Sequence, residues 1–423
     1  MDFLQVYGTI LISAYSITTI LILCKLSLGR LPHMYIRLIE YFQDSLTINK
    51  NMDIDNNNSH TICVARDHLT PTYFKKYEVN DSLDASIHLL SNGIQSILQD
   101  DISRPFLSAP AQGWWLLSWP TYFYYEPIPY QLISFYILGF VFRWFFLFPV
   151  RFALLLTSVI WIVACGLICS IFTPAQSTVM YFGITFARLF NASTGLVTRS
   201  HNDENRAQTP GIAVSNHLSA NDIMVLYGDC FYDGKGYTVT GQSHKGFIET
   251  LQKFGSNLTP TLWLNREDQH QRSNFQKKVM DYSSQPSVYP VLLFPEGYCS
   301  NNDTILQFRK AVFTGEVPIY PIALLQNARV GDAFWKEDTY IPYMLRVMSS
   351  WATSYDITYL QPMIKKPSED PADFAARVQS AVGCSIAKDV LPYDGGLKRQ
   401  KDRLKYRSKV QTALFESLMK SST

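Results

Sequence analysis

The sequence predicts an α/β domain, with a mainly parallel central sheet flanked by helices, that follows N-terminal membrane helices. Only 17% of the residues are charged and 47% are hydrophobic, and a charge fraction so far below the usual quarter is typical of membrane proteins. The longest apolar segments lie in the first half of the chain. After about residue 200, short apolar runs alternate with helical patterns. Such alternation indicates a parallel sheet covered by helices.

The first apolar segment, Phe3–Cys24, is nearly uninterrupted and long enough to cross a bilayer as a helix. A cleaved signal peptide is the alternative, but Asp2 precedes the segment without any Lys or Arg, and the apolar core is too long. We therefore expect a retained anchor. Lys25, Arg30 and Arg37 follow it, so the positive-inside rule places the next part of the chain on the cytosolic side.

The second apolar segment, Gln131–Phe172, is too long for one crossing and contains Arg143 and Arg151. Charged side chains are costly in hydrocarbon, so we expect these arginines to snorkel or to lie at a shallow re-entrant turn. In either case the chain returns to the side it left. Pro149 favours a break between two apolar helices, predicted at 132–150 and 152–172 with the break at Phe148–Arg151.

The region between the two apolar segments is mixed. Thr47–Cys63 is polar and without period, as in a linker, and Ser82–Asp101 has helical apolar spacing. Residues 104–130 are rich in Trp, Tyr and Pro, which suits a membrane interface or a loop packed on a soluble core. A further apolar and aromatic segment, Val179–Phe190, is expected on the surface before the α/β domain.

The chain is predicted to contain five regions. They are a transmembrane anchor at 1–30, a cytosolic linker and helical region at 31–130, a hydrophobic helical hairpin in the membrane at 131–173, the α/β domain at 174–399 and a basic tail at 400–423. The tail suits contact with anionic headgroups or a solvated helix face. The seven cysteines are scattered, without a Cys-x-x-Cys pair, and indicate free thiols in a reducing compartment.

The alternation after residue 200 places the expected strands and helices. Four apolar runs are predicted strands: Ile212–Val214, Tyr237–Thr240, Thr261–Leu264 and Val291–Phe294. Helical patterns lie between them: one from Asn221, one through Phe247–Phe254 and one through Phe275–Tyr282.

His217 and Asp222 are the candidate catalytic pair, because a carboxylate that orients a histidine is the smallest unit of general-base catalysis. On one continuous helix their side chains would lie roughly 140° apart and would not meet. They meet if the chain turns at Asn216–Ala220 and a helix begins near Asn221. The alternative is that Ser219 and Asp222 form only a capping box, with His217 a loop histidine.

Three later stretches add candidate functional groups. Arg266 follows a predicted strand, and its fork of donors suits a phosphate. Phe294-Pro295-Glu296-Gly297 ends another strand with a carboxylate and a glycine. Val317–Leu324 is an apolar strand interrupted by prolines. Each also has a structural explanation, namely a surface arginine, a turn and an edge strand.

Taken in order, these stretches resemble the glycerolipid acyltransferase superfamily. The four matching blocks are His217–Asp222, Arg266, Phe294–Gly297 and Ile319–Pro321. Five more stretches resemble the type 3 and type 4 glycerol-3-phosphate acyltransferases of the endoplasmic reticulum: Cys299–Asn302, Phe308–Lys310, Gly331–Trp335, Leu345–Ala352 and Asp394–Arg399. The resemblance is dense from about 211 to 399 and mainly architectural before that.

The resemblance implies a role for each candidate residue. His217 is implied as the general base for the acceptor hydroxyl, and Asp222 as the group that orients its ring. Arg266 is implied to bind the acceptor phosphate, and Lys310 is a weaker candidate for a phosphate contact. The implied acceptor pocket is shaped by Phe294, Pro295, Glu296 and Gly297.

The implied reaction moves a fatty acyl group from acyl-CoA to the sn-1 hydroxyl of glycerol-3-phosphate. The alternatives are a lysophosphatidic acid or other lysophospholipid acceptor and, more remotely, an inactive lipid-binding membrane protein. We expect acyl-CoA as co-substrate and membrane lipids as partners, with no metal, other cofactor or nucleic acid. The implied location is the endoplasmic reticulum membrane, with a multi-pass or hairpin anchor and a cytosolic active site.

Three departures from the family pattern bear on the acceptor more than on the reaction. Tyr298 stands where a small hydroxyl residue is usual, and Ala311 replaces a glycine after the basic pair. Between the histidine and the aspartate the chain has Leu218–Asn221 instead of a small residue followed by proline. The acceptor specificity is therefore the least certain part of the resemblance.

Overall fold

The computed structural model describes residues 2–47, 104–106, 130–232, 236–243, 246–264, 269–285 and 289–398. The chain divides into two compact units, and the larger comprises Met1–Gln43 and Ser108–Gly395. The predicted linker at 47–63, the helix at 82–101, most of the aromatic stretch at 104–130 and the tail at 400–423 lie outside the described residues.

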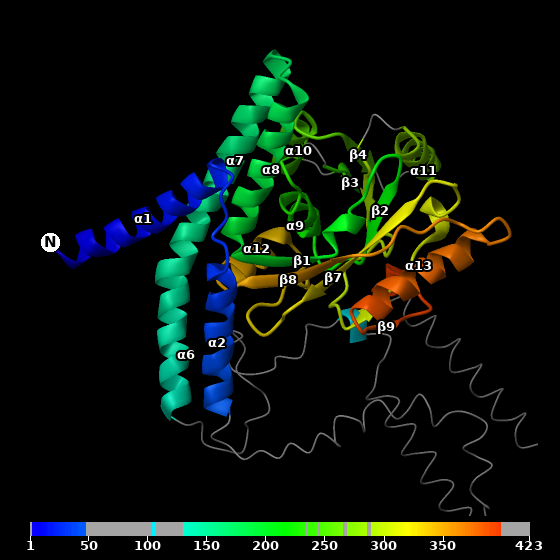
Figure 1. The fold of residues 1–423 in the computed structure, drawn as a ribbon. Coiled ribbons are helices and arrows are strands. Elements are labelled where there is room, and N and C mark those ends of the chain that lie inside the picture. Colours follow the sequence, from blue (N-terminus) through cyan, green and yellow to red (C-terminus); the bar gives the residue numbers. More distant parts are fainter. Residues whose placement is uncertain are drawn as a thin grey trace, which may run out of the picture. The chain divides into compact units, whose positions relative to one another are not determined.

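The centre of the larger unit is a seven-stranded sheet with the strand order β1-β8-β7-β2-β5-β3-β4 (Figure 1). Its strands are β1 (Leu196–His201), β2 (Ile212–Ser215), β3 (Thr238–Gln242), β4 (Thr261–Leu264), β5 (Val291–Leu293), β7 (Ile319–Gln326) and β8 (Thr353–Tyr359). Of its strand pairs, β7 with β8 is antiparallel and the others are parallel. The predicted mainly parallel sheet is therefore confirmed. A small parallel pair joins β6 (Thr304–Ile305) to β9 (Asp389–Val390).

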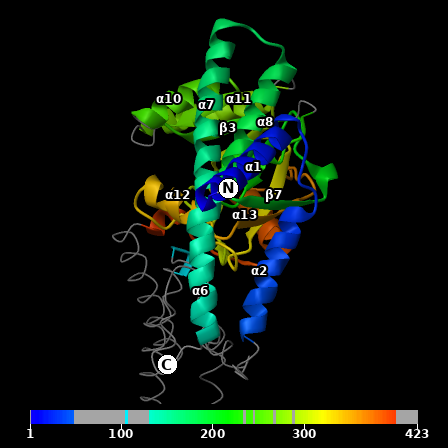
Figure 2. The same cartoon turned by 90° about the vertical axis from the view of Figure 1, so that its left-hand side faces the viewer.

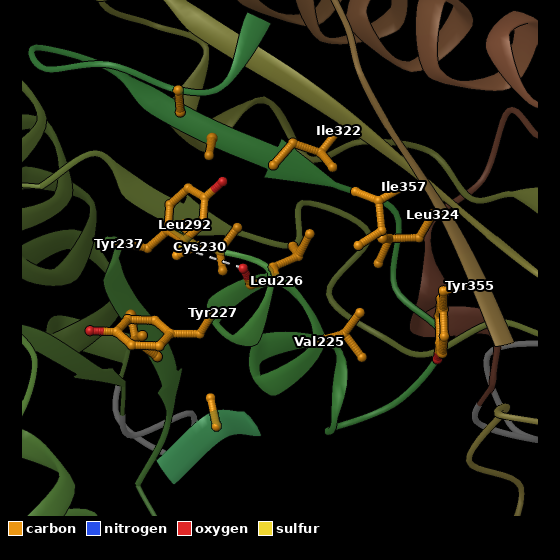
Figure 3. Close-up of a cluster of buried hydrophobic side chains, with 14 of the residues drawn as sticks. Val225, Leu226, Tyr227, Cys230, Tyr237, Leu292, Ile322, Leu324, Tyr355 and Ile357 are labelled. Atoms are coloured by element: carbon orange, nitrogen blue, oxygen red, sulfur yellow. Dashed lines mark hydrogen bonds between the residues drawn. The ribbon is translucent and has the colours of Figure 1, made fainter. Parts of the chain in front are cut away.

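Helices cover both faces of the sheet, because successive side chains of a strand point to opposite faces. On β2, Ala213 points into one core and Ile212 and Val214 into the other. The first core lies under α8 (Gln176–Ser193) and α9 (Asp222–Gly228), and Figure 3 shows α9 side chains among those of the strands. The second lies under α11 (Gln269–Ser283) and α13 (Pro371–Ser385). Burial on both faces explains why these strands read as continuous apolar runs.

Six further α-helices complete the described part of the larger unit. They are α1 (Phe3–Leu23), α2 (Leu31–Thr47), α6 (Tyr130–Phe142), α7 (Phe148–Ile171), α10 (Phe247–Ser256) and α12 (Tyr340–Met348). Two stretches among the described helices are long and apolar enough to cross a membrane, Phe3–Leu23 and Ser134–Ile171. The first has no buried residue, as expected for an anchor surrounded by lipid.

The predicted hairpin with a break at Phe148–Arg151 is wrong. A π-helical segment, Arg143–Leu147, joins α6 to α7, so the chain continues as one helical path (Figures 1 and 2). Pro149 does not break this path because it stands in the first turn of α7, where a missing N–H is tolerated. The chain reverses later, at 172–175, and α7 then packs against α8.

The prediction for Val179–Phe190 is also wrong. This segment forms most of α8, and Met180, Ile184 and Ala187 are buried in the core beneath the sheet. Its apolar residues therefore serve the α/β domain on one side and α7 on the other.

The two arginines of the long apolar segment neither snorkel nor mark a turn. Arg151 is buried and donates to three main-chain carbonyls at the end of α12: Met348 (2.8 Å), Ser350 (2.6 Å) and Trp351 (2.7 Å). Arg143 is buried beside it and donates to the carbonyl of Ser349 at 3.5 Å. Cations are favourable at a helix C-terminus, where carbonyls lack helical partners. These contacts attach the long apolar helix to the α/β domain.

Candidate active site

The turn after β2 carries the candidate histidine at the carboxyl edge of the sheet. Asn216, the first residue after the strand, is fully buried. Its side chain donates to the carbonyl of Leu324 on β7 at 2.9 Å and accepts from the N–H of the same residue at 2.8 Å. This pair of hydrogen bonds fixes the turn to the neighbouring strand, so His217 leaves the sheet in one defined direction.

The predicted pairing of His217 with Asp222 is confirmed. The ring Nδ1 lies 2.9 Å from the carboxylate Oδ2. Asp222 is the first residue of α9, with Asn221 as the N-cap residue, so the turn and helix start occur where the spacing requires them. Asp222 also accepts from the Ser219 hydroxyl at 3.1 Å. One carboxylate therefore contacts both the histidine ring and Ser219, and the N-cap residue Asn221 makes no side-chain capping hydrogen bond.

Asp222 is fully buried and surrounded by hydrogen-bond donors. Besides the histidine ring and the Ser219 hydroxyl, the donors are the N–H groups of Leu218 (2.6 Å) and Ser219 (2.9 Å) and the hydroxyl of Tyr355 (3.1 Å). Such a carboxylate has little freedom to move. Since it accepts from Nδ1–H, it selects the tautomer in which Nε2 of His217 is free to accept a proton.

The Phe294–Gly297 stretch packs directly against the histidine. The ring of Phe294 stacks on that of His217 with centroids 4.4 Å apart. Glu296 is fully buried, with Oε1 accepting from the N–H of His217 at 3.0 Å and Oε2 from that of Leu306 at 3.3 Å. Both oxygens thus hold backbone, and burial raises the pKa of Glu296 to about 8. Glu296 therefore fixes the backbone at His217 and Leu306.

Gly297 has a conformational reason to be glycine. Its φ of +71° lies in the left-handed region, and an added Cβ would come 2.9 Å from the guanidinium of Arg309. That guanidinium pairs with Asp394 at 2.8 Å. Pro295, two residues earlier, accepts from the N–H of Arg309 at 3.1 Å. The turn beside the histidine is therefore fixed from both sides.

Comparisons with known proteins agree with this geometry. Residues 197–325 match the family model described as Acyltransferase. Glycerol-3-phosphate acyltransferase 3 of Danio rerio is 33% identical over 349 residues, which cover 81% of this chain and 76% of that protein. Glycerol-3-phosphate acyltransferase 4 of Homo sapiens is 32% identical over 316 residues, 73% of this chain and 68% of that protein. The chain belongs to the glycerolipid acyltransferase family.

One solved structure also matches this acyltransferase, the 1-acyl-sn-glycerophosphate acyltransferase PlsC of Thermotoga maritima. It is 14% identical, with a TM-score of 0.39, and the match covers 56% of this chain and 96% of that chain. A similarity of this size says nothing about the acceptor.

Cys299 belongs to the acyltransferase site, although the sequence did not single it out as a functional group. Its sulfur is near enough to the ring of His217, whose side chain is 17% exposed, to affect the pKa of that ring. Burial of the ring lowers the pKa of His217, but the Cys299 sulfur and the Asp222 carboxylate raise it, and the net shift is upward. The resemblance included Cys299 as part of a block, and only contact with the ring distinguishes it.

The structure does not test the two predicted phosphate contacts. Arg266 lies outside the described residues; it follows β4, which is parallel to β3 and ends at Leu264. Lys310 is exposed at the start of the 3-10 helix Lys310–Val312. Their roles stay predictions.

The Ile319–Pro321 block lies in the middle of the sheet, not at its edge. It begins β7, which pairs with β2 on one side and β8 on the other. Pro321 lies beside Val214 in the parallel pairing, and the antiparallel pairing with β8 starts one residue later, at Ile322. The proline therefore removes no donor from that ladder. The block therefore pairs with β2, the strand that precedes the turn carrying His217.

Proposed function

We propose that this acyltransferase transfers a fatty acyl group from acyl-CoA to the sn-1 hydroxyl of glycerol-3-phosphate. The products are lysophosphatidic acid and CoA, and this reaction is the first step of phospholipid and triacylglycerol synthesis. The observation that carries the proposal is the buried Asp222 carboxylate 2.9 Å from His217. The choice of acceptor is supported by relatives named glycerol-3-phosphate acyltransferases 3 and 4.

In the proposed mechanism His217 acts as the general base. Its Nε2 takes the proton of the acceptor hydroxyl as that oxygen attacks the thioester carbonyl of acyl-CoA. The C–O bond forms, the C–S bond breaks and the sulfur of CoA leaves, receiving the proton from His217. Asp222 holds the ring and stabilises the imidazolium that exists between the two proton transfers. No covalent intermediate on the protein is needed.

The proposed acceptor contact is Arg266, with Lys310 as a second candidate. A guanidinium binds a phosphate through two parallel N–H donors and so orients it as well as attracting it. Correct orientation of a bound acceptor is worth several kcal/mol of the barrier. The proposed location is the endoplasmic reticulum membrane, with the α/β domain at 174–399 on the cytosolic side. The two long apolar stretches support membrane attachment.

A substitution at the histidine tests the reaction. We expect His217→Ala to reduce acyl transfer about 10²–10⁴-fold, the usual contribution of a general base, while the protein still enters membranes and folds. His201→Ala is the matched control, because His201 is a half-exposed histidine on β1, and it should keep wild-type activity. Wild-type activity of purified His217→Ala would exclude the base assignment.

Competition between acceptors tests the substrate. Purified protein is given labelled acyl-CoA with equal amounts of glycerol-3-phosphate and lysophosphatidic acid, and the products are separated. We expect most of the label in lysophosphatidic acid. Label mainly in phosphatidic acid would replace the proposed acceptor by a lysophospholipid, and acyl transfer to neither would favour the inactive lipid-binding alternative.

A further inference from the structure

A polar cavity of about 270 Å³ lies away from the catalytic pair, between α2 and the edge of the sheet. Helix α2 contributes one wall, and β1, β8 and the residue after β7 contribute the other. Hydrogen bonds fix α2 in place, because Tyr35 donates to the carbonyl of Trp351 at 3.2 Å and Gln43 to that of Arg329 at 3.1 Å. The helical wall of the cavity is thus hydrogen-bonded to the α/β domain.

Two arginines face this cavity without an ion-pair partner. Arg37 comes from α2 and Arg199 from β1. In the part of the chain that the structure describes, neither guanidinium makes a hydrogen bond or an ion pair, although each is charged. Both act on His33, which also lines the cavity: burial and Arg199 lower the pKa of His33, Asp356 raises it, Arg37 lowers it, and the net shift is downward. Arg37 and Arg199 are both exposed residues, and two guanidiniums without an ion-pair partner supply donors that suit a phosphate.

Two carboxylates, Glu40 and Asp356, line the same cavity. They favour a ligand that carries a positive charge as well as a phosphate. Glu40 accepts from the side chain of Asn327 at 2.7 Å. Asp356 lies across the strand pairing from Arg199 and 3.7 Å from Nε2 of the half-exposed His201. With His33 neutral, two guanidiniums and two carboxylates balance each other. A ligand with only negative or only positive charge would leave some of these charged side chains without a partner. A ligand that carries both a negative and a positive charge can pair with all four.

The position of α2 relates the cavity to lipid headgroups. Seven residues separate the end of α1 at Leu23 from the start of α2 at Leu31, so α2 begins within about 25 Å of the end of the candidate membrane helix. Leu31, Met34 and Leu38 are exposed along one face of α2, and the cavity residues occupy another. A helix with such faces suits the level of the headgroups.

We propose that this cavity binds a phosphate ester that also carries a primary ammonium group, the chemistry of the phosphatidylethanolamine headgroup and of soluble phosphoethanolamine. The phosphate lies between Arg37 and Arg199, and the ammonium donates to Glu40 and Asp356. A choline group has no N–H donor and binds less well. Neither the candidate catalytic pair nor Phe294–Gly297 lines this cavity.

The cavity is connected to the catalytic pair through β8. Tyr355 lines the cavity, and its hydroxyl donates to Asp222. Its neighbours Ser354 and Asp356 point to the cavity side of the strand, since side chains alternate. A ligand held by Asp356 therefore restrains the strand that positions the catalytic carboxylate.

Binding is tested on the full-length protein in phosphatidylcholine nanodiscs, with soluble phosphoethanolamine followed by calorimetry. Each charge-assisted contact to phosphate contributes about tenfold to the dissociation constant. We therefore expect Arg37→Ala and Arg199→Ala each to weaken binding about tenfold. Arg30→Ala is the matched control, because Arg30 is an exposed arginine just before α2 that does not line the cavity, and its affinity should equal that of the wild type.

Two results would overturn the proposal. One is an affinity for phosphoethanolamine that is unchanged in both Arg37→Ala and Arg199→Ala, which excludes the site. The other is inorganic phosphate or phosphocholine binding as tightly as phosphoethanolamine, which excludes recognition of the ammonium. The measurement needs no acyl transfer, so it stands whether or not the proposed reaction is correct.

A second set of nanodiscs distinguishes the two sources of the ligand. Phosphatidylethanolamine replaces part of the phosphatidylcholine, and the titration with soluble phosphoethanolamine is repeated. A weaker apparent affinity supports the lipid as the ligand, since it competes for the cavity. An unchanged affinity that still depends on Arg37 and Arg199 supports the soluble compound.

Discussion

Tyr355 donates a hydrogen bond of 3.1 Å to Oδ1 of Asp222, the carboxylate oxygen that does not contact His217. The tyrosine comes from β8, 133 positions later in the sequence, and is almost fully buried. Oδ2 accepts from the ring while Oδ1 is held by the hydroxyls of Tyr355 and Ser219. The orientation of the candidate catalytic pair thus depends on a strand from the far end of the acyltransferase domain.

Tyr355→Phe removes one donor from Asp222 and leaves the ring in place. We expect kcat to fall about tenfold with unchanged KM values, because a hydrogen bond to a charged group contributes about 1.5–3 kcal/mol. The measurement is steady-state kinetics for both substrates, together with the melting temperature. Tyr41→Phe, at an exposed tyrosine of α2, is the control. A change in KM alone would show that the hydroxyl does not act through Asp222.

The acyl transfer should lose activity as the pH falls. Only neutral His217 accepts a proton, and the pKa of His217 lies above its ordinary 6.5 because the Cys299 sulfur and Asp222 outweigh the effect of burial. Activity is therefore present above the folded-state pKa and disappears below it. We expect the acidic limb of the kcat profile above pH 6.5, and Cys299→Ala should move it to lower pH. A limb that stays in place would exclude the contribution of the sulfur.

Gly297→Ala should destabilise the turn beside the histidine. The left-handed φ of +71° costs an alanine about 1–2 kcal/mol, and its Cβ would press on Arg309. We expect a lower melting temperature and a reduced kcat. Gly8→Ala provides the comparison, since a Cβ at Gly8 meets no atom within 4 Å. Equal melting temperatures for the two variants would contradict the requirement for glycine.

Arg151→Leu should weaken the attachment of α7 to the acyltransferase domain. It removes the Arg151 donor from the carbonyls of Met348 and Ser350 and leaves Trp351 only the hydrogen bond from Tyr35, and each buried unsatisfied group costs about 1–3 kcal/mol. We expect a large loss of folded protein and a lower melting temperature in detergent, with partial recovery for Arg151→Lys. If Arg151→Leu folds as well as Arg30→Leu, the attachment does not depend on these bonds.

Arg266→Ala should raise the KM for glycerol-3-phosphate about tenfold or more while the KM for acyl-CoA stays nearly constant, since a charge-assisted phosphate contact is lost. Initial rates with each substrate varied in turn provide the measurement. Lys310→Ala, made in parallel, should have a smaller effect on the same constant. An effect of Arg266→Ala confined to acyl-CoA would assign the arginine to the other substrate.

Much of the fold and of the catalytic pair is encoded locally. The strand, turn and helix start around His217 follow from a short apolar run, polar turn residues and a five-residue spacing, and these are properties of neighbouring residues. The parallel sheet likewise follows from the alternation of apolar runs and helical patterns. The order of the four sequence blocks was enough to indicate the family.

Other features depend on partners that are distant in the sequence. An arginine in an apolar segment is costly in hydrocarbon but favourable against free carbonyls, and Arg151 meets such carbonyls about 200 positions later. Pro149 suggested a break, yet a π-helical segment before it allows the helix to continue. The apolar pattern of residues 131–172 predicts neither the carbonyl partners of Arg151 nor the π-helical segment.

For Glu296 and Tyr355, too, the local sequence predicted the position and the tertiary structure determined the contact. Local pattern placed Glu296 at a strand end, but packing turned its carboxylate inward to hold the N–H of His217. Tyr355 looked like any aromatic residue of a buried strand until the sheet brought it to Asp222. Spacing along the chain determined which two residues form the catalytic pair, because their contact spans a single turn. The groups that hold this pair were determined by strand order in the sheet, since their contacts close loops of about 80 and 133 positions.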